Sequence, residues 1–335
     1  MEALLYDKLG ENWAQCRLCH HFCKIKPGAK GICNVRENQN GTLVSLVFDR
    51  VIATSCDPIE KKPMFHFKPG STAYSIATMG CNFKCRFCQN SDIAQVPAGR
   101  KGVIQGRQIQ PHAIVEQALA SGCQSIAYTY TEPSVFFELA YETAKLAREN
   151  KLSNIFVTNG YMSADLIHLV APFLDAANVD LKAFDDNFYQ TYCQARLEPV
   201  KKTLKLMKKA GILVEVTTLL IPGLNDDPGE LTALARFIAK DLGCDTPWHI
   251  SRFHPSYKMT DVGVTQVSNL ERACEIGQKA GLYYVYTGNV PGLAENTHCH
   301  NCGTLVVKRH GYTIENYLKE KGACPKCGTQ VSGIY

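Results

Sequence analysis

The stretch SIATMGCNFKCRFC at residues 75–88 decides how this chain folds. Its first half belongs to an apolar run that predicts a buried β-strand over 73–78. Cys81, Cys85 and Cys88 follow in the loop directly after that strand. Three thiolates at this spacing can bind three irons of a cubane cluster and leave the fourth iron without a protein ligand. Such an open position suits reaction chemistry, whereas structural metal sites are closed.

Two other interpretations of these cysteines stay open at this point. They could form a three-cysteine zinc site, or occur in a turn by chance. Their place after a strand, and the alternating pattern that follows them, favour the cluster. Phe87, just before the last cysteine, would shield the cluster on one side.

Downstream of the cysteines, short β-rich runs alternate with helical patterns. We expect strands at 73–78, 125–130, 154–158, 177–181, 213–220, 248–253 and 282–286. We expect helices at 114–120, 135–149, 164–169, 200–210, 230–242 and 270–280. This alternation predicts right-handed βαβ units and a parallel α/β sheet. About six or seven units are too few for a closed eight-fold barrel, so we expect a partial (β/α)6-type barrel with its chemistry at the carboxyl ends of the strands.

The composition indicates a globular protein in a reducing compartment. Of the 335 residues, 45% are hydrophobic and 20% are charged, and the net charge is +5, too mild an excess to indicate nucleic-acid binding. Residues 1–16 lack a signal-peptide pattern, and no apolar run approaches about 18 residues. We therefore expect a cytoplasmic protein without a membrane partner. Because cytosolic thiols stay reduced, the 16 cysteines indicate metal ligands rather than disulfides.

The cysteine clusters also divide the chain. We expect a Cys-rich N-terminal region with short strands at 1–70, the barrel at 71–290 and a C-terminal module at 295–335. The module has two C-x2-C knuckles, each followed by a glycine that lets the backbone turn toward the thiolates. Four soft ligands in a closed tetrahedron suit Zn2+ or a rubredoxin-like iron, and an unmetallated hairpin is the alternative. The expected ligands of this zinc-ribbon-like module are Cys299, Cys302, Cys324 and Cys327.

The N-terminal region offers a second set of four thiols, with His20 and His21 nearby as substitutes. A second iron–sulfur cluster here would supply electrons, and a zinc ion would stabilise the fold. Because the spacing is not that of a ferredoxin, we favour zinc. The expected ligands are Cys16, Cys19, Cys23 and Cys33. The cysteines that stand alone are predicted to be small buried apolar residues: Cys56, Cys123, Cys193, Cys244 and Cys274.

The C-x3-C-x-aromatic-C pattern, with Phe87 as its aromatic residue, resembles the cluster motif of the radical SAM superfamily. The resemblance implies that Cys81, Cys85 and Cys88 bind a [4Fe–4S] cluster, whose fourth iron is chelated by the amino and carboxylate groups of S-adenosylmethionine (SAM). It further implies that one electron breaks the sulfonium–carbon bond, which yields methionine and a 5′-deoxyadenosyl radical. This radical abstracts hydrogen from a substrate, while the protein positions the reactants and excludes water.

The segment YTYTEP at 128–133 takes the place of a Gly-Gly-Glu-Pro motif of that superfamily. This match implies that Thr131 and Glu132 lie near the methionine amino group of SAM. The chain departs from the motif, because Tyr130 and Thr131 replace its two glycines. An ordinary strand-to-helix turn is the alternative interpretation.

The later strand ends resemble segments that line SAM in glycyl-radical-enzyme activases. Val157 stands where activases often have Asp, so we expect no contact of that kind there. Asp180 and Lys182 lie on one side of an extended strand, where they would pair with each other or bind ligand groups. A structural hydrogen bond is the alternative role of a lone histidine before proline, as at His254. The cofactor-binding residues expected from these strand ends are Thr158, Asn159, Asp180, Lys182, Asn225 and His254.

Along nearly its full length, the chain resembles the radical SAM enzymes of the AmmeMemoRadiSam system. The barrel of these enzymes is related to pyruvate formate-lyase activating enzymes. The resemblance implies Memo-like and AMMECR-like proteins as partners, and an electron donor such as flavodoxin or ferredoxin. The segments that carry it are CRLCHHFC at 16–23, DPIEKKP at 57–63, HFKPGS at 66–71, the run 81–90, YTEP at 130–133 and the C-terminal ribbon.

Three functions are compatible with these motifs. The first is SAM-dependent hydrogen abstraction from a small molecule or a cofactor precursor. The second is activation of a protein by installing a glycyl radical. The third is a non-catalytic metal-binding scaffold, against which the complete set of Cys81, Cys85 and Cys88 argues. A protein substrate needs an open groove at the site, whereas a small molecule needs a pocket closed by the N-terminal region or the ribbon.

Overall fold

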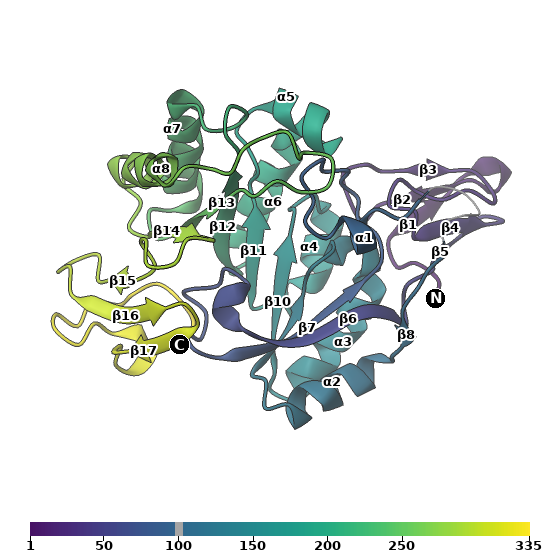
Figure 1. The fold of residues 1–335 in the computed structure, drawn as a ribbon. Coiled ribbons are helices and arrows are strands. Elements are labelled where there is room, and N and C mark those ends of the chain that lie inside the picture. The colour runs from purple at the N-terminus through teal and green to yellow at the C-terminus, as the bar shows by residue number, and fades with distance from the viewer. Residues whose placement is uncertain (98–102) are drawn as a thin grey trace.

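Parallel strands that follow one another along the chain form the centre of the molecule (Figure 1). The structure is a computed structural model that describes residues 1–97 and 103–335. The parallel strands are β7 (Thr72–Thr78), β9 (Ser125–Tyr128), β10 (Ser153–Thr158), β11 (Ala176–Asp180), β12 (Leu213–Leu220), β13 (Trp248–Arg252) and β14 (Val285–Gly288). Two antiparallel strands, β6 (Arg50–Pro58) and β8 (Arg107–Gln108), extend this sheet beyond β7. The result is a nine-stranded mixed sheet with the order β14-β13-β12-β11-β10-β9-β7-β6-β8.

The sequence explains why these segments form a buried sheet. Almost every residue of β7, β9 and β11 is buried, as expected for parallel strands that are covered on both faces. The antiparallel strand β6 pairs along the whole length of β7 and so protects what would otherwise be the free edge of the parallel sheet.

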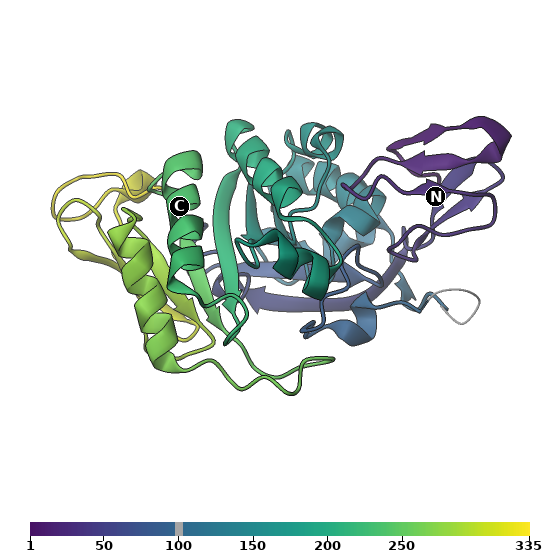
Figure 2. The same ribbon diagram turned by 90° about the horizontal axis from the view of Figure 1, so that it is seen from above.

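Helices connect the parallel strands and lie along the outer side of the curved sheet (Figure 2). Several of these helices contact one another within this layer. The short elements near the ends of the strands are α1 (Ser91–Ala94), η4 (Pro133–Phe136), α5 (Asp186–Phe188), η5 (Tyr189–Cys193) and η6 (Ile238–Leu242). The longer helices are α2 (Pro111–Ala120), α3 (Phe137–Glu149), α4 (Ala164–Val170), α6 (Leu197–Lys209), α7 (Pro228–Phe237) and α8 (Val267–Lys279).

The predicted α/β alternation is confirmed, with most element ends within a few residues of their expected positions. The last parallel strand is displaced, because it was expected at 282–286 and spans Val285–Gly288. Two strands of the sheet were not predicted, β6 and β8. Since β6 pairs with β7, the N-terminal segment 1–70 contributes a strand to the central sheet, and the division into domains stays a prediction.

The chain before β6 forms a small Cys-rich head. A three-stranded antiparallel sheet contains β1 (Tyr6–Lys8), β2 (Ala14–Cys16) and β3 (Lys24–Ile25), with η1 (Gly10–Asn12) between the first two. A hairpin follows, made of β4 (Arg36–Gln39) and β5 (Thr42–Ser45). Asn40 and Gly41 both have positive φ in its turn, the conformation that a two-residue hairpin turn requires.

The C-terminal module lies at the opposite end of the sheet, beside β14 (Figure 1). Its antiparallel sheet contains β15 (Thr297–His298), β16 (Leu305–His310) and β17 (Thr313–Asn316), followed by η7 (Glu320–Gly322). Tyr284 and Tyr286 of the β14 segment pack into its small core. Among the described residues, no helix has both the length and the apolar character needed to cross a membrane.

Candidate active site

A cavity of about 360 Å3 lies at the carboxyl ends of the parallel strands, where α/β sheets collect their binding groups. Loops after β7 and β9 and the ends of β10 to β13 form most of its wall. Residues 61–63, at the end of η2 (Ile59–Lys61), and Asn289, after β14 in sequence, also line it. The predicted site residues that line this cavity are Cys81, Cys85, Phe87, Cys88, Thr131, Glu132, Thr158, Asn159, Asp180 and Lys182.

Two residues expected to bind SAM do not lie on the cavity wall. Asn225 is buried behind it, where its side chain accepts from Ile221 N at 2.7 Å and donates to Lys182 O at 2.6 Å. It therefore supports the loop after β12, as an Asn side chain in a turn commonly does. His254 is exposed, because Phe253 before it is buried and successive side chains of an extended segment point to opposite sides.

The three cluster cysteines have the surroundings expected of metal-bound thiolates. Gly80 turns the chain after β7 with φ +101°, and Phe83 N donates to Cys81 Sγ at 3.4 Å. Burial raises the pKa of the Cys81 thiol well above its usual value, and the Glu132 carboxylate raises it further. A thiolate at this position therefore needs a compensating positive charge, which bound iron supplies. The donor set and the cavity beside it fit an iron–sulfur cluster with one free iron.

Cys193 lies against Cys85, a proximity that sequence reasoning missed. A hydrogen bond with Cys193, together with burial, raises the pKa of Cys85 well above its usual value. The backbone carbonyl of Cys193 also accepts from Lys84 N at 2.9 Å, so η5 supports the cluster loop. Cys193 is buried as expected for a lone cysteine, but nothing in its spacing indicated that it packs beside a ligand.

Glu132 joins two strand ends through one buried carboxylate. It accepts from Ser134 N at 3.2 Å, Ser134 Oγ at 2.9 Å, Thr158 Oγ1 at 2.8 Å and Asn159 N at 2.8 Å. Burial nevertheless raises its pKa, because these hydrogen bonds compensate only in part for the lost hydration. Glu132 thereby fixes the positions of Thr158 and Asn159 on the neighbouring strand.

Tyr130 stands where the resembling motif has glycine, and its backbone keeps the conformation that favours glycine, with φ +62°. Asn90 Nδ2 donates to Tyr130 O at 2.7 Å. The phenol donates to Asp57, and Lys62 Nζ lies 4.4 Å from the ring centroid. These contacts hold a strained residue in place, so the departure from the motif changes the side chain and leaves the turn intact.

A charged group from the end of β6 and the segment after it lies beside Tyr130. Asp57 Oδ2 pairs with the buried Lys62 Nζ at 2.6 Å, and Oδ1 pairs with Lys61 Nζ at 2.8 Å. Burial alone would raise the pKa of Asp57, but the hydrogen bonds from Lys61, Lys62 and Tyr130 lower it strongly. The segment 57–63 was expected only to carry the family resemblance, and its place beside the cavity was not predicted. The two adjacent lysines in it were the available signal of a charged site.

Asp180 and Lys182 form the ion pair that their spacing allowed, with 2.7 Å between Oδ2 and Nζ. Lys182 Nζ also lies 5.9 Å from the centroid of the Phe87 ring. Burial alone would lower the pKa of Lys182, but Asp180 and the nearby Cys85 and Cys193 raise it well above its usual value. The ammonium group therefore stays charged inside the cavity.

The C-terminal cysteines are arranged as ligands of a single ion. Cys299 and Cys327 have their Sγ atoms 3.6 Å apart, and Cys302 and Cys324 have theirs 3.7 Å apart. A tetrahedral zinc with bonds of about 2.3 Å places its thiolates about 3.8 Å apart. Hydrogen bonds with Thr329 lower the pKa of Cys327 to about 5, which favours the thiolate. The four residues could therefore bind one metal ion.

The N-terminal cysteines Cys16, Cys19, Cys23 and Cys33 line a small cavity inside the head. Cys16 ends β2, and the next two lie in the turn before β3. Asn82, the neighbour of Cys81 in sequence, lines the same cavity. The structure thus places the four thiols around one cavity, beside the cluster loop. Of the lone cysteines, Cys56 is exposed rather than buried as predicted, because the antiparallel strand β6 is only partly covered.

Comparisons with known proteins converge on one superfamily. A profile of the Radical SAM superfamily matches residues 75–235. The uncharacterized protein MJ0808 of Methanocaldococcus jannaschii is 44% identical over 333 residues, which cover 98% of both chains. The putative glycyl-radical enzyme activating enzyme MJ1632 of the same organism is 25% identical over 188 residues, 55% of this chain and 68% of the relative.

A solved structure supports the fold. The crystal structure of a radical SAM methyltransferase from Sphaerobacter thermophilus matches with a TM-score of 0.53 and 18% identity, over 71% of each chain. At this level of identity, the match shows a shared architecture and carries no information on the substrate.

Proposed function

The chain belongs to the radical SAM superfamily, and from this membership we propose that it is an enzyme that cleaves SAM reductively and removes hydrogen from a small molecule or a cofactor precursor. One observation carries the proposal: Cys81, Cys85 and Cys88 line the same cavity as the polar residues from the other strand ends. When bound there, a [4Fe–4S] cluster and SAM supply the one-electron bond cleavage that yields methionine and the 5′-deoxyadenosyl radical.

The chain's own residues bind and orient these groups in the proposed reaction. Cys81, Cys85 and Cys88 hold the cluster, and no other cysteine lines that cavity among the described residues. Lys182 offers a buried positive charge to a carboxylate, and Asp180 offers an acceptor to hydroxyl or amino groups. These roles match the needs of SAM, which carries a carboxylate, an amino group and ribose hydroxyls.

Other residues shape the cavity rather than bind directly. Glu132 holds Thr158 and Asn159 in position through its buried hydrogen bonds. Phe83 and Phe87 supply apolar wall beside the thiols, which excludes water from a reactive centre. Because the aromatic walls and the ion pair belong to different strand ends, the completed fold is needed to assemble the site.

The cavity walls favour a small substrate over a protein. Residues 61–63 come from the segment between β6 and β7, so the wall includes residues beyond the carboxyl ends of the parallel strands, together with Asn289 after β14. The volume of about 360 Å3 lies within the usual range of small-molecule pockets, roughly 300 to 1,000 Å3, and the cluster, SAM and the substrate share this room. Lys61 and Lys62 beside the cavity favour a substrate with anionic groups.

Activation of a glycyl-radical enzyme is the second candidate function. It is favoured by the match to MJ1632, whose name describes it as a putative activating enzyme of that class. That match covers 55% of this chain, so a large part of the chain has no counterpart in it. Hydrogen abstraction from a small molecule accounts better for the part of the cavity wall formed by residues 61–63, because these residues help to enclose the cavity.

The finer features of the predicted architecture belong to the same proposal. We propose that the sheet forms an open partial barrel and that the C-terminal module is a zinc ribbon, for which the sulfur separations of 3.6 and 3.7 Å are the support. The segment 57–63, one carrier of the resemblance to AmmeMemoRadiSam enzymes, borders the cavity and supports membership of that system, with Memo-like and AMMECR-like partners. Reduced thiols favour a cytoplasmic location.

The test is anaerobic reconstitution with iron and sulfide, followed by dithionite and SAM, with 5′-deoxyadenosine as the readout. We expect the wild type to produce it, and Cys85→Ala to lose the product together with the iron and sulfide bound at this centre. Cys274→Ala is the matched control, since this buried cysteine lies on α8, away from the cavity. A protein that holds its cluster and yet releases no 5′-deoxyadenosine would contradict the proposal and favour a scaffold.

Extract from cells grown in deuterated water separates the two candidate functions. The enzyme is incubated separately with the small-molecule filtrate and with the protein fraction. Deuterium in 5′-deoxyadenosine from the filtrate alone supports the small substrate. Deuterium from the protein fraction alone, with a glycyl radical visible by electron paramagnetic resonance (EPR), supports the activase.

A further inference from the structure

The head cysteines surround a space instead of converging on a point. The four C-terminal thiols all lie within 4.8 Å of one another, whereas the head thiols form no such group, although the structure describes all of them. The four head thiols instead line one small cavity. A single zinc would draw its thiolates to within about 4 Å of one another, so this spacing fits a polynuclear centre better.

Arg36 provides a second, independent sign that the cavity accepts a ligand. Its side chain is 2% exposed, lines the cavity and pairs with the buried Glu138 through Nη2. Its Nε and Nη1 groups have no hydrogen-bond partner in the structure. Buried N–H groups are costly when unpaired, and a guanidinium fork seeks anionic acceptors. The inorganic sulfides and thiolates of an iron–sulfur cluster are acceptors of that kind.

The head cavity also adjoins the cluster loop directly. A methyl group at Gly80 would come within 2.6 Å of Val35 Cγ1 and 3.2 Å of Cys33 O, so the two segments are in close contact. Asn82 lines the head cavity, and its backbone carbonyl lies 2.9 Å from His21 Nε2. Cys81 is therefore next in sequence to a residue that forms part of the wall of the head cavity.

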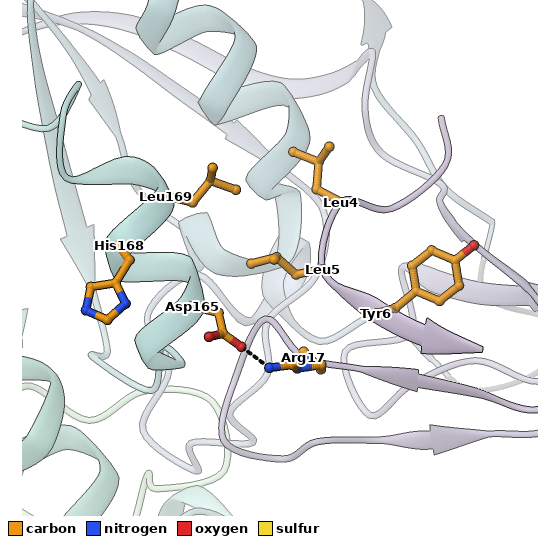
Figure 3. Close-up of a pocket in the computed structure, with 7 residues that line it drawn as sticks. All are labelled: Leu4, Leu5, Tyr6, Arg17, Asp165, His168 and Leu169. Atoms are coloured by element: carbon orange, nitrogen blue, oxygen red, sulfur yellow. Dashed lines mark hydrogen bonds and ion pairs between the residues drawn. The ribbon is translucent and has the colours of Figure 1, made fainter. Parts of the chain in front are cut away.

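Backbone pairing fixes the head against the end of β10. Cys19 forms a β-bridge with Met162, and Ser163 N donates to Leu18 O at 3.0 Å. On the side of the head, Arg17 reaches across to Asp165 at the start of α4 (Figure 3). These three contacts join residues 17–19 of the head to residues 162–165, so the distance between the two sets of cysteines is set by the fold.

From these contacts we propose that Cys16, Cys19, Cys23 and Cys33 bind a second iron–sulfur cluster, through which electrons reach the centre at Cys81, Cys85 and Cys88. The structure thus favours the iron–sulfur alternative over the zinc that the cysteine spacing favoured. The electron route rests on the proposed function, whereas the identity of the head metal does not.

The proposed step moves one electron and no atoms. A low-potential one-electron donor protein of the flavodoxin or ferredoxin class is oxidised by one electron at the head. The same electron passes to the centre in the main cavity and is consumed when the sulfonium–carbon bond of SAM breaks. No proton or group is transferred at the head, in keeping with the closed four-thiol ligand set there.

The first test removes the main centre and keeps the head. In the full-length chain with Cys81, Cys85 and Cys88 all replaced by Ala, we expect about four iron and about four acid-labile sulfide per chain after anaerobic reconstitution, with an EPR signal on reduction. Adding Cys23→Ser to this variant should remove iron and sulfide together. Zinc without labile sulfide at the head would overturn the proposal, whatever the SAM activity of the wild type.

Arg36→Lys tests whether the guanidinium contacts the cluster. Lysine retains a positive charge beside Glu138 but lacks the planar Nε and Nη1 donors. Hydrogen bonds to cluster sulfur raise its reduction potential, so we expect an EPR-monitored titration of the cysteine-triple variant to shift to a more negative potential. An unchanged potential in a variant that still binds iron and sulfide would show that Arg36 does not face the cluster.

The electron route has its own test in the otherwise unmutated chain. Cys23→Ser should abolish 5′-deoxyadenosine formation driven by a purified flavodoxin with its reductase, and leave most of the formation driven by dithionite, which can reduce the main centre directly. Equal activity with both reductants, or equal loss with both, would overturn the relay. Since the metal content of the head is measured separately, this failure is distinguishable from a failure of the proposed function.

Discussion

Glu132 and Tyr130 show how single residues hold the site together. Glu132 uses one carboxylate to pair with two residues of the next strand end, Thr158 and Asn159. Tyr130 accepts a backbone conformation that glycine would adopt without strain, and its phenol is anchored on Asp57. Both residues hold other groups in position. Their contribution to the site therefore does not require that they bind a ligand themselves.

We expect Glu132→Gln to destabilise the folded protein by about 1 to 3 kcal/mol. The amide retains one acceptor oxygen and turns a donor toward groups that donate to Glu132, among them Ser134 N and Asn159 N. The free energy of unfolding in urea, measured anaerobically, checks this expectation. Glu149→Gln, at an exposed position on α3, is the control; a loss of equal size in both variants would contradict the role assigned to Glu132.

At the scale of residues, the sequence predicted the site residues that belong to recognisable motifs. It missed the residues whose position depends only on tertiary packing. The three cluster cysteines and the pair of Asp180 and Lys182 were accessible from spacing and strand alternation. Cys193 was not, because its contact with Cys85 depends on how η5 folds back. The exposure of His254 was not accessible either, because its motif position does not show that β13 ends at Arg252 and that the side chain two residues later faces solvent.

At the scale of elements, the turn from β7 into the cluster loop links the sheet to the head. Gly80 adopts φ +101° there and leaves no room for a side chain against Val35 and the backbone of Cys33. The first strand of the parallel sheet, the cluster loop and the head cavity consequently meet at one residue. A larger residue would have to displace the head to preserve the turn.

Gly80→Ala should therefore cost more than the backbone strain alone. We expect a loss of roughly 2 to 4 kcal/mol in the free energy of unfolding, since overpacking adds about 1 to 3 kcal/mol to the strain of positive φ. Gly122→Ala is the matched control, because Gly122 also has positive φ but a methyl there meets no atom within 4 Å. Equal losses in the two variants, measured by urea unfolding, would show that the head does not press on Gly80.

The elements of the parallel sheet were predictable because each strand is an apolar run between turn residues. The antiparallel strands β6 and β8 were not, since β6 is half-exposed and β8 has two exposed residues. They join the sheet because β6 pairs with the free edge of β7 and β8 pairs with β6. Such tertiary pairing cannot be predicted from a local sequence pattern. For the same reason, the boundary at residue 70 does not coincide with the edge of the sheet.

At the scale of the whole molecule, a buried polar network joins the C-terminal module to the sheet. His66 Nδ1 donates to Ser332 O at 2.6 Å, and its Nε2 lies 2.7 Å from Tyr286 Oη. The backbone of His66 donates to Glu215 at 2.8 Å, and Glu215 pairs with His249 Nε2 at 2.6 Å. The network ties the end of the chain to β12, β13 and β14.

His66 makes the stability of this arrangement depend on pH. Burial lowers the pKa of His66 from 6.5 to about 4. Between these values the unfolded chain binds a proton that the folded chain does not, so stability falls as pH drops from 6.5 toward 4, by roughly 3 kcal/mol for this group. We expect His66→Asn to show a shallower decline of unfolding free energy over this window. His112→Asn, on the exposed side of α2, should retain the wild-type slope, and equal slopes in all three proteins would contradict this role.

The C-terminal metal should act on stability and leave the main centre in place. We expect Cys324→Ser to lose one equivalent of zinc and several degrees of melting temperature, because a structural metal contributes folding energy. Absorbance of the iron–sulfur centre near 400 nm should remain. Simultaneous loss of zinc and of that absorbance would contradict the separation of the two sites, since none of the four C-terminal cysteines lines the main cavity.

The most direct test of the central claim asks whether one iron of the main centre is open to SAM. Electron–nuclear double resonance of the reduced, reconstituted protein with SAM labelled in its amino nitrogen and carboxylate carbon measures this contact. We predict hyperfine coupling from both labels, which Cys88→Ala abolishes. A reduced cluster without coupling, its fourth iron bound by a protein group such as Cys193, would contradict the assignment of the site.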